Sequence, residues 1–126
     1  MASKQEILGA YMGRITANDL EGAAGYSTDD VVFHWAGHGP LAGEYTGKAA
    51  VVKMFADYAS MVDASIEPHD SLFSNDHVVA LVRATLSRGD RSVATNRVVV
   101  YHFAGDKISE VWVVDADQQA VAELLA

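Results

Sequence analysis

The fold follows from residues 78–114, VVALVRATLSRGDRSVATNRVVVYHFAGDKISEVWVV, where β-branched and aromatic side chains recur between short polar turns. Three segments rich in these side chains, 78–88, 92–103 and 107–114, predict β-strands. The turns between them contain Gly and Asp and have the length that joins antiparallel neighbours. A fourth strand, 66–73, is predicted just before them. The C-terminal half is therefore predicted to be an antiparallel meander.

Helical periodicity replaces this pattern in the N-terminal half. Ser3 and Glu6 form a capping box, and the first helix is predicted to run to about residue 17. Asp19 is predicted to cap a short second helix that extends through Tyr26. A third helix is predicted after residue 47 and ends near Asp63. The apolar residues that share one face are Ile7, Leu8, Tyr11, Met12 and Ile15 in the first helix, and Val51, Phe55, Tyr58 and Val62 in the third.

The order of these elements predicts an α+β fold. A strand at 31–35 separates the second and third helices, and Asp117 is predicted to cap a short closing helix. Because helices precede most of the strands and do not alternate with them, α+β is favoured over a parallel α/β fold. Three N-terminal helices and a short C-terminal helix would pack on a bent, mixed, mostly antiparallel sheet. The resulting cone-shaped barrel would open into a pocket, within a single domain of residues 1–126.

Composition excludes several classes of function. Nine Lys and Arg against seventeen Asp and Glu give a net charge of −8, so the basic footprint of a nucleic-acid or anionic-membrane binder is missing. The absence of cysteine excludes disulfides, thiolate catalysis and iron–sulfur ligation. No apolar stretch approaches the ~18 residues of a membrane span, and residues 1–6 contain no apolar core of a signal peptide. We therefore expect a cytoplasmic protein.

Three segments resemble the nuclear transport factor two-like superfamily, and within it the SnoaL-like polyketide cyclases that border on the ketosteroid isomerases. They are YSTDDVVFHW at 26–35, PLAGEYTG at 40–47 and KISEVWVVD at 107–115. The resemblance spans Tyr11 to Leu125 and implies a cofactor-independent isomerase or cyclase. Such an enzyme would remove a proton alpha to the carbonyl of a polyketide-like or terpenoid-like compound in an apolar pocket. A non-catalytic domain that binds a small ligand is the alternative, because this fold hosts both.

The resemblance also assigns roles to particular residues. The ketosteroid isomerase pattern has a Tyr in the first helix that donates to the developing oxyanion, and Tyr11 falls there. Its two catalytic carboxylates would fall at Trp35 and Tyr101, so steroid isomerisation by that mechanism is not expected. The SnoaL-like cyclases instead have an acid/base Asp after the Trp of the last strand, which corresponds to Asp115. We expect Asp115 to abstract the proton and Tyr11 to donate to the enolate oxygen.

Each of these two assignments has a structural alternative. Alternation places Val111, Val113 and Asp115 on one face of the last strand and Ile108 on the other. Asp115 could be a helix-start carboxylate that binds backbone amides, although Asp117 competes for that role. Tyr11 could serve only to fill the core.

His34 is a second candidate proton acceptor, because the ordinary pKa of histidine, about 6.5, suits proton transfer at neutral pH. The isomerase alignment favours Phe33 and Trp35 as the inward-facing residues, unless a bulge before Gly37 reverses them. His38 lies in the Gly- and Pro-rich loop that follows. A structural role is the alternative for both histidines.

The remaining candidates would bind substrate. Arg97 and Tyr101 share a face of the long strand, and Arg97 could clamp a carboxylate or enolate oxygen or pair with an acidic neighbour at the sheet rim. The predicted substrate-binding set is Trp35, His38, Tyr58, Arg97, Tyr101 and Val113. The five histidines are scattered, so we expect no metal and no cofactor.

The predicted sheet has apolar residues on both of its faces, and both need cover. Helices can cover only one face. We therefore expect a homodimer through the outer face, and the family resemblance implies the same.

Overall fold

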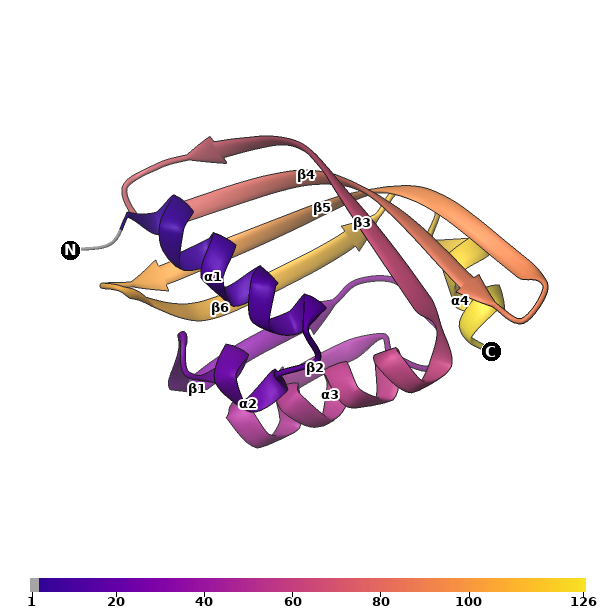
Figure 1. Cartoon of the computed structure of the whole chain (residues 1–126), viewed down its shortest axis with the longest axis horizontal. Coiled ribbons are helices and arrows are strands. Elements are labelled where there is room, and N and C mark those ends of the chain that lie inside the picture. Colours follow the sequence, from indigo (N-terminus) through magenta and orange to yellow (C-terminus); the bar gives the residue numbers. More distant parts are fainter. Residues whose placement is uncertain (1–2) are drawn as a thin grey trace.

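The computed structural model describes residues 3–126, whose six strands form one sheet in the order β2-β1-β6-β5-β4-β3 (Figure 1). Strand β1 pairs parallel with β6, and every other neighbouring pair is antiparallel. The predicted α+β class with a mixed, mostly antiparallel sheet is confirmed. The elements are α1 (Lys4–Thr16), α2 (Leu20–Ala24), β1 (Ser27–Trp35), β2 (Gly43–Thr46), α3 (Lys48–Met61), β3 (Asp63–Phe73), β4 (His77–Arg88), β5 (Arg91–Ala104), β6 (Lys107–Asp115) and α4 (Gln118–Leu125).

Side-chain caps begin the helices as expected. The hydroxyl of Ser3 accepts a hydrogen bond from the amide of Glu6 at the start of α1. Asp19 accepts from the amide of Gly22 at the start of α2, and α2 ends at Ala24, two residues before the predicted end. Asp117 caps α4 through the amide of Ala120, so the side chain of Asp115 is not the helix cap. None of the helices within residues 3–126 is long and apolar enough to cross a membrane.

Strand β2 was not predicted, because its segment has the composition of a loop. It pairs antiparallel with the end of β1, where Gly43 lies opposite Trp35 and Thr46 opposite Val32. Gly43 and Gly47 both have positive φ, 138° and 90°, a backbone conformation that residues with a side chain rarely adopt. The positive φ angles at these two glycines turn the backbone into strand β2 at its start and out of it toward α3 at its end.

The helices cover one face of the sheet, which we call the inner face. Along β5, alternate side chains from Thr95 to Phe103 are buried, while those between them are half-buried or exposed. Figure 1 shows α1, α2 and α3 on the same side of the sheet, and α4 at the end of the molecule farthest from the N-terminus. The opposite, outer face has no helix over it in residues 3–126. This arrangement determines which side chains can meet inside the cone.

Candidate functional site

Arg97 on β5 and Asp115 at the end of β6 lie opposite each other in the sheet and form a buried ion pair on the inner face. Nε of Arg97 donates to Oδ1 of Asp115 at 2.6 Å, and Nη2 donates to Oδ2 at 3.3 Å. The two side chains are only 7% and 3% exposed. Arg97 therefore pairs with an acidic neighbour, which was one of the two alternatives from the sequence. The pair lies in the interior and not at the rim of the sheet.

Two aromatic residues enclose this pair. Nη1 of Arg97 donates to the hydroxyl of Tyr58 at 3.3 Å. The guanidinium carbon lies 5.3 Å from the ring centre of Trp35 and 6.0 Å from that of Tyr58, within cation–π range. Trp35 ends β1 and Tyr58 is in the last turn of α3, so four elements contribute to one cluster. We call Trp35, Tyr58, Arg97 and Asp115 the inner cluster.

Arg97 is the permanent charge of the inner cluster. Burial acts to lower its pKa, but Tyr58 and Asp115 outweigh burial, so the pKa lies above its ordinary value. A guanidinium has five N–H bonds. Three of them donate to Asp115 and Tyr58, and the other two, on Nη1 and Nη2, have no partner within residues 3–126. Arg97 therefore retains unused hydrogen-bonding capacity at two N–H groups.

Tyr11 lies elsewhere in the interior. Its ring meets that of Tyr101 edge-on, with centres 6.3 Å apart, and the hydroxyl of Tyr101 contacts Sδ of Met12 at 3.7 Å. Burial raises the pKa of both tyrosines above 10, so both hydroxyls stay protonated. Tyr101 is four residues from Arg97 along β5, which at about 3.3 Å per residue corresponds to ~13 Å.

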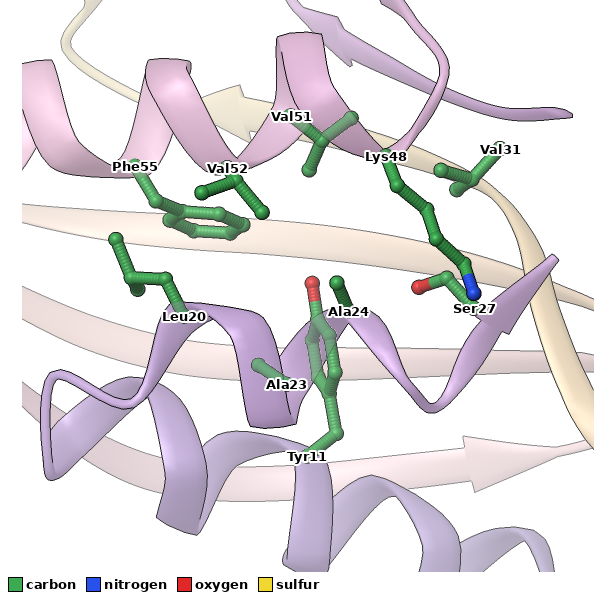
Figure 2. A pocket seen from close by; sticks show the side chains of 10 residues that line it. All are labelled: Tyr11, Leu20, Ala23, Ala24, Ser27, Val31, Lys48, Val51, Val52 and Phe55. Atoms are coloured by element: carbon green, nitrogen blue, oxygen red, sulfur yellow. The ribbon is translucent and has the colours of Figure 1, made fainter. Parts of the chain in front are cut away.

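The structure therefore separates the two residues expected to act together. The cavity that Tyr11 lines has no contribution from Asp115 (Figure 2). Arg97 does not line that cavity either, so no contact within residues 3–126 joins Tyr11 to Asp115, and their joint role stays a prediction. Arg97, assigned only to substrate binding from the sequence, is the donor next to Asp115.

His34 lies on the outer face, and its predicted role inside the cone is wrong. Its Nε2 is 2.5 Å from Oε2 of Glu110, and its Nδ1 is 3.6 Å from Oε2 of Glu44. Its ring stacks on Trp112, with centres 5.4 Å apart and planes at 9°. The alternation of β1 continues to its end, so Phe33 and Trp35 face inward as the alignment indicated.

The remaining predicted residues divide between core and surface. Tyr101 and Val113 are buried on the inner face, and Val113 lies opposite Trp35 in the sheet. His38 is exposed in the loop after β1 and has no polar contact within residues 3–126. Its neighbours Gly37 and Gly39 pack on α4. Over the described part of the chain, no three His, Asp or Glu side chains are arranged to hold a metal ion.

Comparison with known proteins agrees with the observed fold. A family model described as the SnoaL-like domain matches residues 8–111. No curated protein matches the chain. Among solved structures, an NTF2-like protein from Burkholderia xenovorans is 20% identical, with a TM-score of 0.89 over 98% of this chain and 95% of that chain.

Two further solved structures were obtained together with small molecules. TerC, co-crystallised with polyporic acid, is 20% identical, with a TM-score of 0.85 over 97% of each chain. A hypothetical protein from Catenulispora acidiphila with a ketosteroid isomerase-like fold, in complex with trimethylamine, is 13% identical. Its TM-score is 0.79 over 96% of this chain and 94% of that chain. At these identities the structures show the shared fold. Because the family model matches most of its length, the chain belongs to the SnoaL-like domain family.

Proposed function

We propose that the chain binds a small carbonyl compound, polyketide-like or terpenoid-like, at the inner cluster and acts on it in the cytoplasm as a cofactor-independent isomerase or cyclase. The observation that carries the proposal is the buried Arg97, which keeps two N–H donors free between aromatic walls. Those walls suit an apolar ligand, and the donors suit a single oxygen that carries or develops negative charge.

The energetic cost of the Arg97–Asp115 pair supports a functional role. Replacing a buried ion pair by apolar residues is often neutral or stabilising by ~1–4 kcal/mol. A chain that only needed a stable core would have no reason to keep two charges there. Perturbed and buried charges that also have unused hydrogen-bonding capacity are typical of binding and catalytic sites.

The proposed reaction is a proton transfer at carbon. The carbonyl oxygen of the substrate accepts hydrogen bonds from the free N–H groups of Arg97. An oxygen of Asp115, which has two lone pairs, takes the proton from the carbon alpha to the carbonyl. The C–H electron pair becomes the double bond of an enolate, whose oxygen Arg97 stabilises. In ring closure, the enolate carbon bonds to a second carbonyl carbon of the substrate, whose C=O π pair moves to its oxygen, and that oxygen takes the proton from Asp115. In isomerisation, Asp115 returns the proton to another carbon of the enolate, and the double bond shifts.

Binding without catalysis is the second candidate, and a specific observation favours it. Both oxygens of Asp115 already accept hydrogen bonds from Arg97, so part of the carboxylate's hydrogen-bonding capacity is already used. A pure binder would use Arg97 and Tyr58 to hold an acidic ligand. Polyporic acid, the compound crystallised with TerC, is an acidic aromatic probe for that possibility.

One experiment separates the two candidates. Exchange of the alpha protons of 2-tetralone for deuterium is followed by NMR with the wild type, Asp115→Asn and the outer-face control Glu110→Gln. Calorimetric titration with polyporic acid is carried out on the same proteins. We expect the exchange rate to fall at least about a hundredfold in Asp115→Asn, as for loss of a general base, and to stay unchanged in the control.

Absence of wild-type exchange above the buffer rate would overturn the catalytic proposal. If polyporic acid still binds in that case, and the affinity falls in Arg97→Met, the binding candidate is supported. Thermal unfolding of each variant shows whether a lost signal comes from lost folding.

We also propose that a second copy of the chain covers the outer face. Leu72, Val79, Val100 and Trp112 lie opposite one another on four neighbouring strands, and Val114 beside them is 40% exposed. A sheet face of this composition without helices needs cover. Sedimentation should show a dimer for the wild type and a monomer for Trp112→Arg, with Asn96→Arg at the margin of the face as the control. A monomeric wild type would contradict this.

A further inference from the structure

A band of titratable side chains crosses the outer face of the sheet, beside its apolar residues. Strand pairing places His77, His102 and Glu110 side by side on β4, β5 and β6. His34 and Glu44 lie opposite each other on β1 and β2. The band is partly exposed in the single chain. We call the following side chains the histidine band: His34, Glu44, Asp76, His77, His102 and Glu110.

At the β4–β5 end of the histidine band, two histidines share one carboxylate. The ring centres of His77 and His102 are 4.7 Å apart. Nδ1 of His77 lies 3.3 Å from Oδ1 of Asp76, and Nε2 of His102 lies 3.9 Å from Oδ2. The hydroxyl of Ser109 donates to the backbone carbonyl of His102 and therefore accepts from Nδ1 of the same residue, at 2.7 Å. Nε2, the nitrogen near Asp76, is thus the one that can take up a proton.

At the β1–β2 end, one histidine lies between two carboxylates. Nε2 of His34 is 2.5 Å from Oε2 of Glu110, and Nδ1 is 3.6 Å from Oε2 of Glu44. A neutral imidazole has one N–H group and a protonated imidazole has two. Only the protonated ring of His34 can therefore present an N–H group to both carboxylates.

The charge of each end depends on pH in the range where histidine titrates. Histidine has an ordinary pKa of about 6.5, whereas those of Asp and Glu lie near 4. With neutral histidines, Asp76 gives the β4–β5 end a charge of −1, and Glu44 and Glu110 give the β1–β2 end −2. With protonated histidines, the two ends carry +1 and −1. Charged side chains farther along the same face keep their charge over this range: Asp63, Glu67, Asp70 and Arg83.

Two copies that pack outer face on outer face can bring the unlike ends together. Most homodimers have two-fold symmetry. If the axis lies between the two sheets and runs along the strands, β4 and β5 of one copy lie over β1 and β2 of the other. The ends that meet then have like charges when the histidines are neutral and opposite charges when they are protonated. Acidification therefore changes repulsion into attraction in an interface that excludes water.

We propose that protonation of His34, His77 and His102 controls the association of two copies through the outer face, in the orientation that brings the unlike ends of the histidine band together. The inference rests on the outer-face dimer proposed above and adds its regulation. The dimer binds more protons than the separate copies, so by linkage a lower pH favours the dimer. The reaction proposed at Asp115 is not involved.

The first test measures the dissociation constant of the dimer by sedimentation between pH 8 and pH 6. We expect the wild-type Kd to fall at least about tenfold, since one linked proton changes Kd by about that factor per pH unit. The control, His38→Gln in the exposed loop after β1, should behave like the wild type. The triple variant should show less than about a twofold change: His34→Gln, His77→Gln and His102→Gln.

A charge reversal tests the orientation at pH 8. Asp76→Lys makes the β4–β5 end positive while the β1–β2 end stays negative, so this variant should form a tighter dimer than the wild type. If like ends met instead, the new charges would face each other and the dimer would not tighten. Asp90→Lys, the same change in the exposed turn between β4 and β5, is the matched control and should leave Kd within about twofold.

The outcomes separate this inference from the dimer on which it rests. A wild type that is monomeric at every pH would overturn both. A dimer that does not tighten on acidification, or a pH dependence that persists in the triple variant, would overturn the inference alone, as would equal effects of Asp76→Lys and Asp90→Lys. If the triple variant fails to fold, His34→Gln and His102→Gln should each reduce the pH dependence. If the wild type does not dissociate on dilution, the series is repeated in Leu72→Ala, which removes apolar area from the outer face.

Discussion

A buried ion pair and a His–Glu hydrogen bond lie on opposite faces of the same sheet and share β6. On the inner face, Arg97 and Asp115 approach to 2.6 Å, and on the outer face His34 and Glu110 approach to 2.5 Å. The distances are almost equal, but the exposed fractions are 7% and 3% for the inner pair against 27% and 35% for the outer pair. Burial, and not distance, determines what each pair costs and what it can do.

The residues around the two pairs also differ in polarity and exposure. The inner pair meets the aromatic faces of Trp35 and Tyr58, and no second carboxylate among residues 3–126 contacts it. The outer pair stacks on Trp112 and has Glu44 nearby, and in the single chain it is partly exposed to solvent, which screens its charge. A ligand oxygen gains more from an unscreened donor, which is why the functional proposal rests on Arg97.

The largest expected effect comes from removing one member of the inner pair. Asp115→Ala should lower the free energy of unfolding by about 3–5 kcal/mol, because Arg97 is then buried without a counter-charge. Urea unfolding measures this. The double variant Arg97→Met with Asp115→Leu should recover most of the loss. An equal cost for Asp115→Ala and Glu110→Ala would refute the contrast between the faces.

A smaller effect concerns the buried tyrosines of the interior. The pKa values of Tyr11 and Tyr101 are raised in the folded chain. The folded chain therefore keeps both phenol protons at pH values at which the unfolded chain loses them. The contribution of the two tyrosines to the free energy of unfolding is fully present below pH ~10, the pKa of tyrosine in the unfolded chain. It then falls as pH rises, by about 1.4 kcal/mol per pH unit for each tyrosine.

Urea unfolding between pH 9 and 11 checks this slope. Tyr11→Phe and Tyr101→Phe should each remove one tyrosine's share of the dependence. A wild-type slope no steeper than that of the double variant would show that the two phenols ionise freely in the folded chain.

The smallest effect is expected on the outer face. Glu110→Gln should change the free energy of unfolding by less than about 1 kcal/mol, since the pair is partly exposed. High salt should reduce even that difference, because exposed charges are screened. Thermal unfolding of the wild type and variant at low and high salt measures it. A larger effect that persists in high salt would indicate that a partner covers this pair.

Much of the fold could be predicted because its signals are local. The caps at Ser3, Asp19 and Asp117 need only the amides three residues on, and the Gly-containing turns between β4, β5 and β6 act within a few residues. Strand β2 could not be predicted in this way, since its pairing with β1 uses backbone groups that every residue has.

The candidate site depended on a feature that the sequence hides. If β5 and β6 paired residue by residue from the turn at residues 105–106 onward, Arg97 would lie opposite Val114. A one-residue bulge at Ser109 shifts the register between β5 and β6, so that Asp115 lies opposite Arg97 instead. The same bulge brings Ile108 into the buried core, although simple alternation had placed it on the other face from Val111.

Local sequence chemistry was therefore enough to specify the α+β class, the helix starts and the inward-facing side of β5, because capping and alternation act between residues close in the chain. Tertiary structure alone decided that Arg97 meets Asp115 and that neither of them lines the cavity of Tyr11. These are contacts between residues far apart in sequence, and they depend on strand register and on the packing of helices over one face.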